Sequence, residues 1–410
     1  MILVRPVSRD VDADLELAFV RMALPASARE FLLEKIPQMH LMVTGISRDE
    51  GRFLRCLPEQ MTTPGREDYP AYVPADVQRR PGTALLSGRK DQLERLVALL
   101  RQQGSQPFAE ALERGISGAA VPPPTHVGSH VFDFGGAPQV MGILNMTPDS
   151  FSDGGRFSSN EDAVGHALAM VEQGAAIIDV GGESTRPGAK PVSVPEELGR
   201  VVPVIEALRK RADIAISIDT RKSDVARAAL SAGAVFVNDV TGFTHDPMLA
   251  QVTAEHGAAC CVMHLQGTPE TMQAGPHYGD VMEDVLQFLA AAIDRGVAAG
   301  IPRARIWVDP GIGFGKTLAH NLLLLRRSRE LRILGQPILF GVSRKNMLGA
   351  LTGNKPPHAR MPATLACIAA LTASGGVDIV RVHDVAEVRD AIQVVHAIRT
   401  GADGGDLYRR

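Results

Sequence analysis

Cysteine is scarce in this chain, and its four cysteines share no functional spacing. Cys260 and Cys261 are adjacent, whereas Cys56 and Cys367 are remote from them. This spacing provides neither a metal-ligand set nor a disulfide framework, so the thiols are expected to act as small core residues. The chain also has no basic run typical of a nucleic-acid surface. No apolar stretch approaches a membrane span, and the N-terminus has no signal-peptide core.

What is present suits a large, evenly charged enzyme. The chain has 410 residues, of which 45% are hydrophobic and 22% charged, and its net charge is −3. This length and composition allow a large core and two or three domains. We therefore predict a cytoplasmic protein with no nucleic-acid or membrane partner.

The most informative segment is 145–155, which reads Asn-Met-Thr-Pro-Asp-Ser-Phe-Ser-Asp-Gly-Gly. It follows an apolar run, Val140–Leu144, that predicts a short buried strand. Its proline and paired glycines favour a tight turn. Asn145, Asp149 and Asp153 offer the hard oxygen ligands that would hold a hydrated Mg²⁺ beside a phosphate. The alternative is an ordinary strand-to-helix loop.

From this segment onward, short apolar runs alternate with amphipathic helical stretches. The predicted strands are 140–145, 176–180, 215–219, 235–238, 259–263, 306–309, 338–341 and 379–382. The predicted helices are 161–173, 195–211, 223–232, 247–255, 281–299, 318–334, 362–374 and 386–399. Eight strand–helix units over this length predict an α/β fold of the (β/α)₈, or TIM barrel, type. An open doubly wound sheet is the competing architecture, but no Gly-x-Gly-x-x-Gly turn opens the series.

Polar residues follow every predicted strand, and in a barrel they would all lie at the C-terminal mouth, where barrel enzymes carry their chemistry. One group suits a di-anionic or phosphorylated ligand: Arg186, Lys345, Arg381 and His383. The other could pair with the donor edge of a heterocycle such as an aminopyrimidinone: Asp219, Asn238 and Asp309. A ligand with both features would satisfy both groups of buried charges.

Structural alternatives stay open for some of these residues. Asp219 could cap the helix that follows it. Arg381 and Asp384 could form a surface pair, which would contribute little. The segment that ends in Lys316 looks like a phosphate-binding loop, but that pattern requires glycine at the position of Pro310.

Seven segments of the chain resemble dihydropteroate synthase, and they occur in that family's order. They are MGILNMTPDSFSDGG, IIDVGGESTRPGA, ISIDTRK, VNDVTG, DPGIGFGKT, GVSRKNMLG and IVRVHDV. The resemblance implies an enzyme of folate synthesis. It would condense p-aminobenzoate with 6-hydroxymethyl-7,8-dihydropterin diphosphate, giving dihydropteroate and pyrophosphate. It also implies a Mg²⁺ cofactor, competition by sulfonamides, and a homodimer through barrel helices.

The resemblance assigns roles position by position. The residues that match the pterin-holding group are Asp219, Asn238, Asp309 and Lys345, with Met263 packed near them. Those that match the pyrophosphate-binding group are Asn145, Arg381 and His383, and Asn145 and Asp153 match the Mg²⁺ positions. The loops of the p-aminobenzoate pocket are matched by Thr185, Arg186, Phe151, Pro187, Phe314 and Lys345. The implied catalytic residues are Asp219, Lys345, Arg381 and His383.

Residues 1–125 lie outside the resemblance and predict a small α/β domain without a catalytic constellation. Its predicted elements are strands at 40–45 and 83–86, a loop at 62–81, a helix at 89–103 and a Pro-rich linker at 115–124. The domain could be structural, or it could serve regulation or a partner. The catalytic barrel is predicted over 126–402, followed by a tail over 403–410.

Two other functions compete with the synthase. A pterin-barrel methyltransferase would share the pterin-holding Asp and Asn but should lack the diphosphate and aminobenzoate loops, and both loops are present. A non-catalytic binding barrel would have lost at least one of five site residues, and none is lost: Asn145, Arg186, Lys345, Arg381 and His383.

Overall fold

The computed structural model describes residues 3–6, 39–44, 50, 71–74, 84–88, 90–117, 121–146, 159–185, 188–189, 191–269 and 271–401. The chain forms two compact units, and the boundary along the chain falls between Ala120 and Val121. The predicted boundary is at residue 125. Among the described residues, no helix is long and apolar enough to cross a membrane.

The first unit contains a four-stranded antiparallel sheet and two helices. In sheet order the strands are β1 (Leu3–Pro6), β2 (Met39–Thr44), β4 (Ala84–Gly88) and β3 (Ala71–Pro74). The helices are α4 (Lys90–Gln102) and α5 (Gln106–Ser117).

Two predictions for this unit are wrong. The predicted loop at 62–81 contains β3, because a strand at the edge of a sheet tolerates proline, as at Pro74. The predicted linker from Gly115 begins inside α5. There Phe108, Leu112 and Ile116 are buried on one face, and this burial outweighs the low helix propensity of a single glycine.

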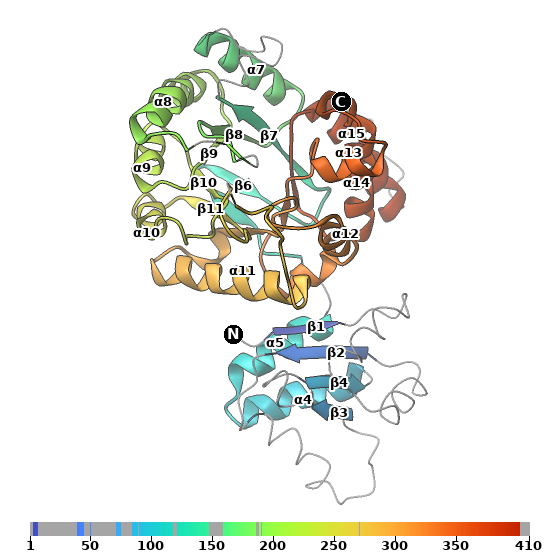
Figure 1. Ribbon diagram of the computed structural model, residues 1–410. Coiled ribbons are helices and arrows are strands. Elements are labelled where there is room, and N and C mark those ends of the chain that lie inside the picture. The colour runs from blue at the N-terminus through green and yellow to red at the C-terminus, as the bar shows by residue number, and fades with distance from the viewer. Residues whose placement is uncertain are drawn as a thin grey trace, which may run out of the picture. The chain divides into compact units, whose positions relative to one another are not determined.

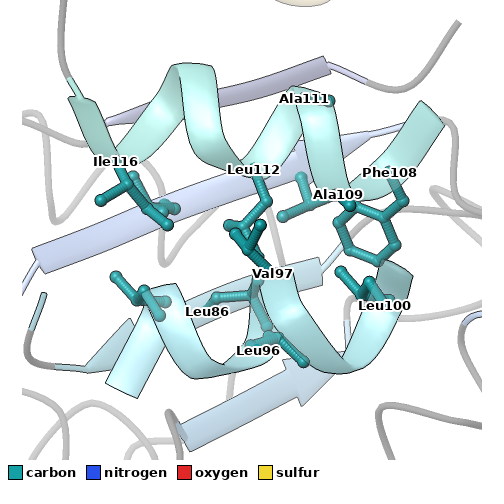
Figure 2. Close-up of a cluster of buried hydrophobic side chains, with 12 residues drawn as sticks. Leu86, Leu96, Val97, Leu100, Phe108, Ala109, Ala111, Leu112 and Ile116 are labelled. Atoms are coloured by element: carbon teal, nitrogen blue, oxygen red, sulfur yellow. The ribbon is translucent and has the colours of Figure 1, made fainter. Parts of the chain in front are cut away.

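The core of the first unit lies between its helices and its sheet (Figure 2). The predicted apolar face of α4, which includes Leu96, Val97 and Leu100, is buried against α5 and against Leu86 of β4. Each such side chain contributes about 1.5–3 kcal/mol when fully buried. The amphipathic pattern of α4 therefore predicted its buried face correctly.

The second unit is the predicted barrel (Figure 1). Its eight parallel strands are β7 (Gln139–Asn145), β8 (Ile177–Gly181), β9 (Ala215–Asp219), β10 (Phe236–Asp239), β11 (Ala259–Met263), β12 (Ile306–Asp309), β13 (Leu339–Phe340) and β14 (Ile379–Val382). Hydrogen-bonded neighbours run in the order β12-β11-β10-β9-β8-β7-β14-β13. A parallel bridge between Val308 and Ile338 joins the two ends and closes the ring.

Helices surround the ring of strands, as Figure 1 shows. They are α7 (Asn160–Glu172), α8 (Val194–Arg211), α9 (Ser223–Ser231), α10 (Met248–Glu255), α11 (Val281–Ala298), α12 (Leu318–Arg326), α13 (Asn346–Leu351), α14 (Met361–Ser374) and α15 (Val385–Thr400), with short 3₁₀ turns at Arg303–Arg305, Ser328–Leu334 and Pro357–Ala359. The predicted helix at 318–334 is α12 followed by a 3₁₀ turn. The short helix α13 was not predicted.

A hairpin that the sequence did not reveal fills the N-terminal end of the barrel. Strands β5 (Thr125–Val127) and β6 (His130–Phe132) pack their buried residues against the first residues of the barrel strands. Phe132 lies edge-on to Trp307, with ring centroids 5.4 Å apart. The Trp307 indole N–H donates to the Thr125 hydroxyl at 3.2 Å. With this end filled by apolar side chains, the opposite, C-terminal end is left for polar chemistry.

Candidate active site

The carboxyl ends of the barrel strands surround one cavity of about 1190 Å³. Ten of the predicted site residues line it: Asn145, Thr185, Asp219, Asn238, Met263, Asp309, Phe314, Lys345, Arg381 and His383. The other four, Phe151, Asp153, Arg186 and Pro187, lie outside the described residues. Asp219, Asn238 and Asp309 are buried. The predicted cations Lys345, Arg381 and His383 are only partly buried.

Arg381 is the centre of the polar network in the cavity. Its Nε donates to Asp179 Oδ2 at 2.5 Å, and its Nη2 donates to Asp219 Oδ2 at 2.7 Å. The Asn238 side-chain amide donates to the same oxygen of Asp179 at 3.0 Å. One guanidinium thus joins β14 to β8 and β9, and fixes the Asp219 carboxylate at the cavity wall.

This network rules out both structural alternatives for its members. Asp219 does not cap α9, because the first backbone N–H of that helix, at Ser223, donates to Asp246 Oδ2 at 2.8 Å. Arg381 does not pair with Asp384, whose carboxylate instead accepts from Arg344 Nε at 3.0 Å. Asp219 and Arg381 instead bond to each other and both line the cavity.

Asp179 is the main site residue that the prediction missed. It is fully buried on β8, and its Oδ1 has no hydrogen-bond partner within the described part of the chain. A signal was present, because a carboxylate stands inside the apolar run 177–180, and a buried charge requires a partner. The sequence could not show that the partner is Arg381, on the eighth strand.

Asp219 and Asp309 hold protons more tightly than free carboxyls do. Burial raises the pKa of Asp219 to about 7; Arg381 opposes this shift and Asp179 reinforces it. Burial also raises the pKa of Asp309 to about 6, partly offset by the Gly311 N–H that donates to its Oδ1 at 2.7 Å. The charge of Arg381 does not fully compensate its carboxylates, so a ligand with N–H donors would be stabilised here.

Two contacts orient the cations of the seventh and eighth strands. His383 Nδ1 lies 2.9 Å from the Ser343 hydroxyl, which fixes the orientation of the imidazole ring. Lys345 Nζ lies 4.1 Å from the centre of the Phe314 ring, within cation–π range. The second contact joins two of the predicted site residues, from the loops after β13 and β12.

The loop after β12 is held from within by Lys316. Lys316 is 3% exposed, and its Nζ donates to the carbonyls of Gly311 and Phe314, each at 2.9 Å. Burial lowers the pKa of Lys316 to about 7. Gly311 has φ +69°, and a Cβ there would lie 2.0 Å from the His264 carbonyl oxygen, so the turn requires glycine. This lysine therefore anchors its own loop, in agreement with the rejection of a phosphate-binding loop.

The fold and the site together define a (β/α)₈-barrel enzyme. Its cavity is lined by carboxylates and an amide, with cationic side chains beside them. Residues 141–383 match the sequence profile of the family described as pterin binding enzyme. The chain belongs to this pterin-binding enzyme family, among the dihydropteroate synthases. The resemblance drawn from the seven segments is confirmed.

The similarity spans nearly the whole length of the relatives. The dihydropteroate synthase of Synechocystis sp. is 49% identical over 278 residues, which are 68% of this chain and 96% of that protein. The Yersinia pestis dihydropteroate synthase, solved with a sulfonamide drug, is 45% identical with a TM-score of 0.65, and the match covers 68% of this chain and 100% of that chain. The Burkholderia cenocepacia enzyme, complexed with 7,8-dihydropteroate, is 44% identical with a TM-score of 0.62 and coverage of 69% and 99%.

Proposed function

We propose that this barrel condenses 6-hydroxymethyl-7,8-dihydropterin diphosphate with p-aminobenzoate, releasing pyrophosphate, through the residues that line its cavity. The observation that carries the proposal is that Asp219, Asn238 and Asp309 line one cavity together with Arg381, which is bonded to Asp179 and Asp219. A pterin carries N–H donors along one edge, which match the carboxylates. The diphosphate of the same substrate carries the negative charge that Arg381 and His383 match.

In the reaction, the bond between the pterin methylene carbon and the diphosphate oxygen breaks, and its electron pair leaves with pyrophosphate. Arg381 has five N–H donors and uses two on carboxylates, so others are available for the leaving group. His383, oriented by Ser343, adds a second donor. Both groups stabilise charge that develops as the bond breaks, which is how such donors lower a barrier.

The methylene carbon gains positive character as the diphosphate leaves, and the electron-rich dihydropterin delocalises it. Ionised Asp219 and Asp309 favour this charge electrostatically. The lone pair of the p-aminobenzoate nitrogen then forms the new C–N bond, and the nitrogen loses a proton. An arylamine is a nucleophile when neutral, so the step requires no strong general base.

The second substrate would bind between the loops after β8 and β12. Thr185 and Phe314 line the cavity from these loops, and Lys345 lies over the Phe314 ring. We assign Lys345 to both subsites: it would contact the pterin on one side and help to shape the aminobenzoate pocket on the other.

We propose Mg²⁺ as the cofactor. Within the described residues, no cluster of three or more His, Cys, Asp or Glu side chains could hold a metal by itself. Mg²⁺ typically keeps several waters and binds through one or two protein ligands plus substrate phosphates. Asn145, which lines the cavity at the end of β7, and the predicted ligand Asp153 would hold it together with the diphosphate. Once bound, Mg²⁺ would supply further positive charge to the leaving group.

A turnover assay tests the proposal. Purified full-length protein would receive the pterin diphosphate, labelled p-aminobenzoate and Mg²⁺, with release of pyrophosphate followed in parallel. Labelled dihydropteroate with an equal amount of pyrophosphate is the expected result. A folded protein that makes neither product would refute the proposal. A homodimer and a cytoplasmic site of action remain predictions from the family resemblance, and light scattering would test the first.

A further inference from the structure

A buried ion cluster lies beside the cavity, between the loop after β8 and the turn after β9. Lys222 Nζ donates to Glu183, to Glu197 Oε2 at 2.6 Å, and to the carbonyl oxygen of Val192 at 2.5 Å. Arg221 Nη2 donates to the other oxygen of Glu183 at 2.7 Å. The Lys222 side chain is 15% exposed and the Glu197 side chain 1%. All three donors of the Lys222 ammonium are therefore used within the protein.

The cluster pairs two carboxylates with two cations. Although burial raises the pKa of Glu183, Lys222 and Arg221 outweigh this effect and hold it below its ordinary value, so the carboxylate stays ionised. A buried ion pair is weak evidence for stability, because desolvation offsets much of the attraction between its charges. A better explanation for four charges at the edge of a substrate cavity is that they hold the neighbouring loop in one conformation.

The contacts tie both ends of one loop to a single lysine. The loop 182–193 begins at the end of β8 and ends at the start of α8. Glu183 lies near its first end and Val192 near its second, and the Val192 N–H donates to the Glu183 carboxylate at 3.3 Å. Lys222 contacts both residues. The loop therefore closes on itself around the Lys222 ammonium.

The same lysine is connected to the end of β9, which carries Asp219. Lys222 follows Asp219 by three residues, and the Thr220 hydroxyl donates to Glu197 Oε1 at 2.8 Å. The loop that Lys222 closes carries Thr185, which lines the cavity, whereas Lys222 itself does not. The cluster thus joins a part of the predicted aminobenzoate pocket to the strand end that holds Asp219.

We propose that Lys222 is a positioning residue for the second substrate: it holds the loop that carries Thr185 in register with Asp219, and so aligns the p-aminobenzoate nitrogen with the pterin carbon. The inference rests on the proposed function. Its physical basis is that a shift of about 1 Å in a reacting group can reduce a rate roughly a hundredfold. A fixed loop avoids that loss.

Lys222→Met tests this directly, because it removes the ammonium and keeps an unbranched stem. We expect kcat to fall and the KM for p-aminobenzoate to rise, each about tenfold or more, because the released loop no longer aligns the second substrate. The KM for the pterin diphosphate should change less than twofold. The double variant Lys222→Met with Glu197→Gln leaves no unpaired charge at position 197, so it serves if the single variant folds poorly. It should show the same difference between the changes in the two KM values. The matched control is Glu330→Gln, which breaks an ion pair with Arg327 whose side chains are each 9% exposed.

Hydrogen exchange supplies a readout that does not require turnover. The backbone N–H groups of residues 183–192, which Pro187 and Pro191 lack, should exchange at least tenfold faster in Lys222→Met than in the wild type. They should exchange at the wild-type rate in the control. Unchanged exchange in this loop would overturn the inference, as would a parallel rise in both KM values. A wild type that exchanges normally but makes no dihydropteroate would instead refute the proposed function.

Discussion

Asp219→Asn should raise the stability of the ligand-free barrel while weakening pterin binding. Asp219 is 7% exposed, and burial raises its pKa from 3.8 to about 7. The unfolded chain ionises this carboxyl near the ordinary value. At pH 8 Asp219 is therefore ionised at a buried position, where the neutral acid would be more stable. A difference of about three in pKa corresponds to about 4 kcal/mol in the free energy of unfolding.

Asparagine has the shape of aspartate without its charge, so the variant removes this cost. Arg381 keeps its second carboxylate, Asp179, and is not left unpaired. Part of the gain is offset, because one charged partner of the guanidinium is lost. We therefore expect about half of the full value, about 2 kcal/mol, which corresponds to a rise of roughly 4–8 °C in Tm at pH 8.

The pH dependence identifies the cause. Because the folded-state pKa of Asp219 is raised, the stability linked to its proton is fully present below about pH 4 and is lost as the pH rises through 7. The advantage of the variant should therefore be greatest at pH 8, shrink by pH 5, and vanish near pH 4. Urea titration of both proteins across this range gives the comparison.

Asp246→Asn is the matched control, and we expect it to change stability in the opposite direction. Burial raises the pKa of Asp246, but hydrogen bonds from Ser223 outweigh burial and leave it below the ordinary value. The contribution of Asp246 to stability is therefore present above the pKa that it has in the unfolded chain. It is lost as the pH falls through the pKa that it has in the folded protein. Removing this charge should lower stability at pH 8. Equal effects from both variants would refute the electrostatic reasoning.

Binding supplies the second half of the test. A hydrogen bond to a charged group contributes about 1.5–3 kcal/mol, so Asp219→Asn should weaken the pterin diphosphate roughly tenfold to a hundredfold. Calorimetric titration should show a much smaller change for p-aminobenzoate. Equal losses for the two ligands would contradict the assignment of Asp219 to the pterin.

Three further predictions concern other parts of the barrel. Arg381→Met should lower the free energy of unfolding by about 3–5 kcal/mol, because Asp179 and Asp219 lose their shared counter-charge; a change under about 1 kcal/mol on urea titration would argue against the network. Chelation of Mg²⁺ should reduce turnover but leave the affinity for 6-hydroxymethyl-7,8-dihydropterin, which has no diphosphate, unchanged; a loss of that affinity on calorimetry would place the metal elsewhere. Phe132→Ala should destabilise the barrel by about 3–5 kcal/mol on thermal unfolding, because the ring packs on Trp307. Both KM values should stay constant, and a change in either would link the hairpin to the site.

The strands of the barrel were predictable because they are short, continuously apolar, and separated by amphipathic helices. Strand bounds in the structure differ from the predicted ones by a few residues at most. The hairpin formed by β5 and β6 was not predictable in this way, since each strand has three residues and too little sequence to show a period. Edge strand β3 was missed because its four residues lie within a segment, 62–81, that is rich in Pro, Arg and Asp and is typical of a loop.

The sequence by itself determined which residues stand at the mouth of the barrel. A parallel strand carries its last residue to the same end as its neighbours, so a polar residue after each apolar run is placed there by chain order alone. Eight polar residues among the predicted site residues line the cavity for this reason. The motifs that these residues form also carried the resemblance to the family.

Only the tertiary structure decided how those residues are paired. Arg381 lies 202 residues from Asp179 and 162 from Asp219 along the chain, and closure of the barrel places β14 beside β7, next to β8. The charge state of Asp219 depends on burial and on the other charges around it, which are properties of the folded cavity. The same is true of Lys222, whose partners come from the loop after β8 and from α8. Local sequence patterns determine the elements and their ends, whereas contacts between distant elements determine partners and protonation.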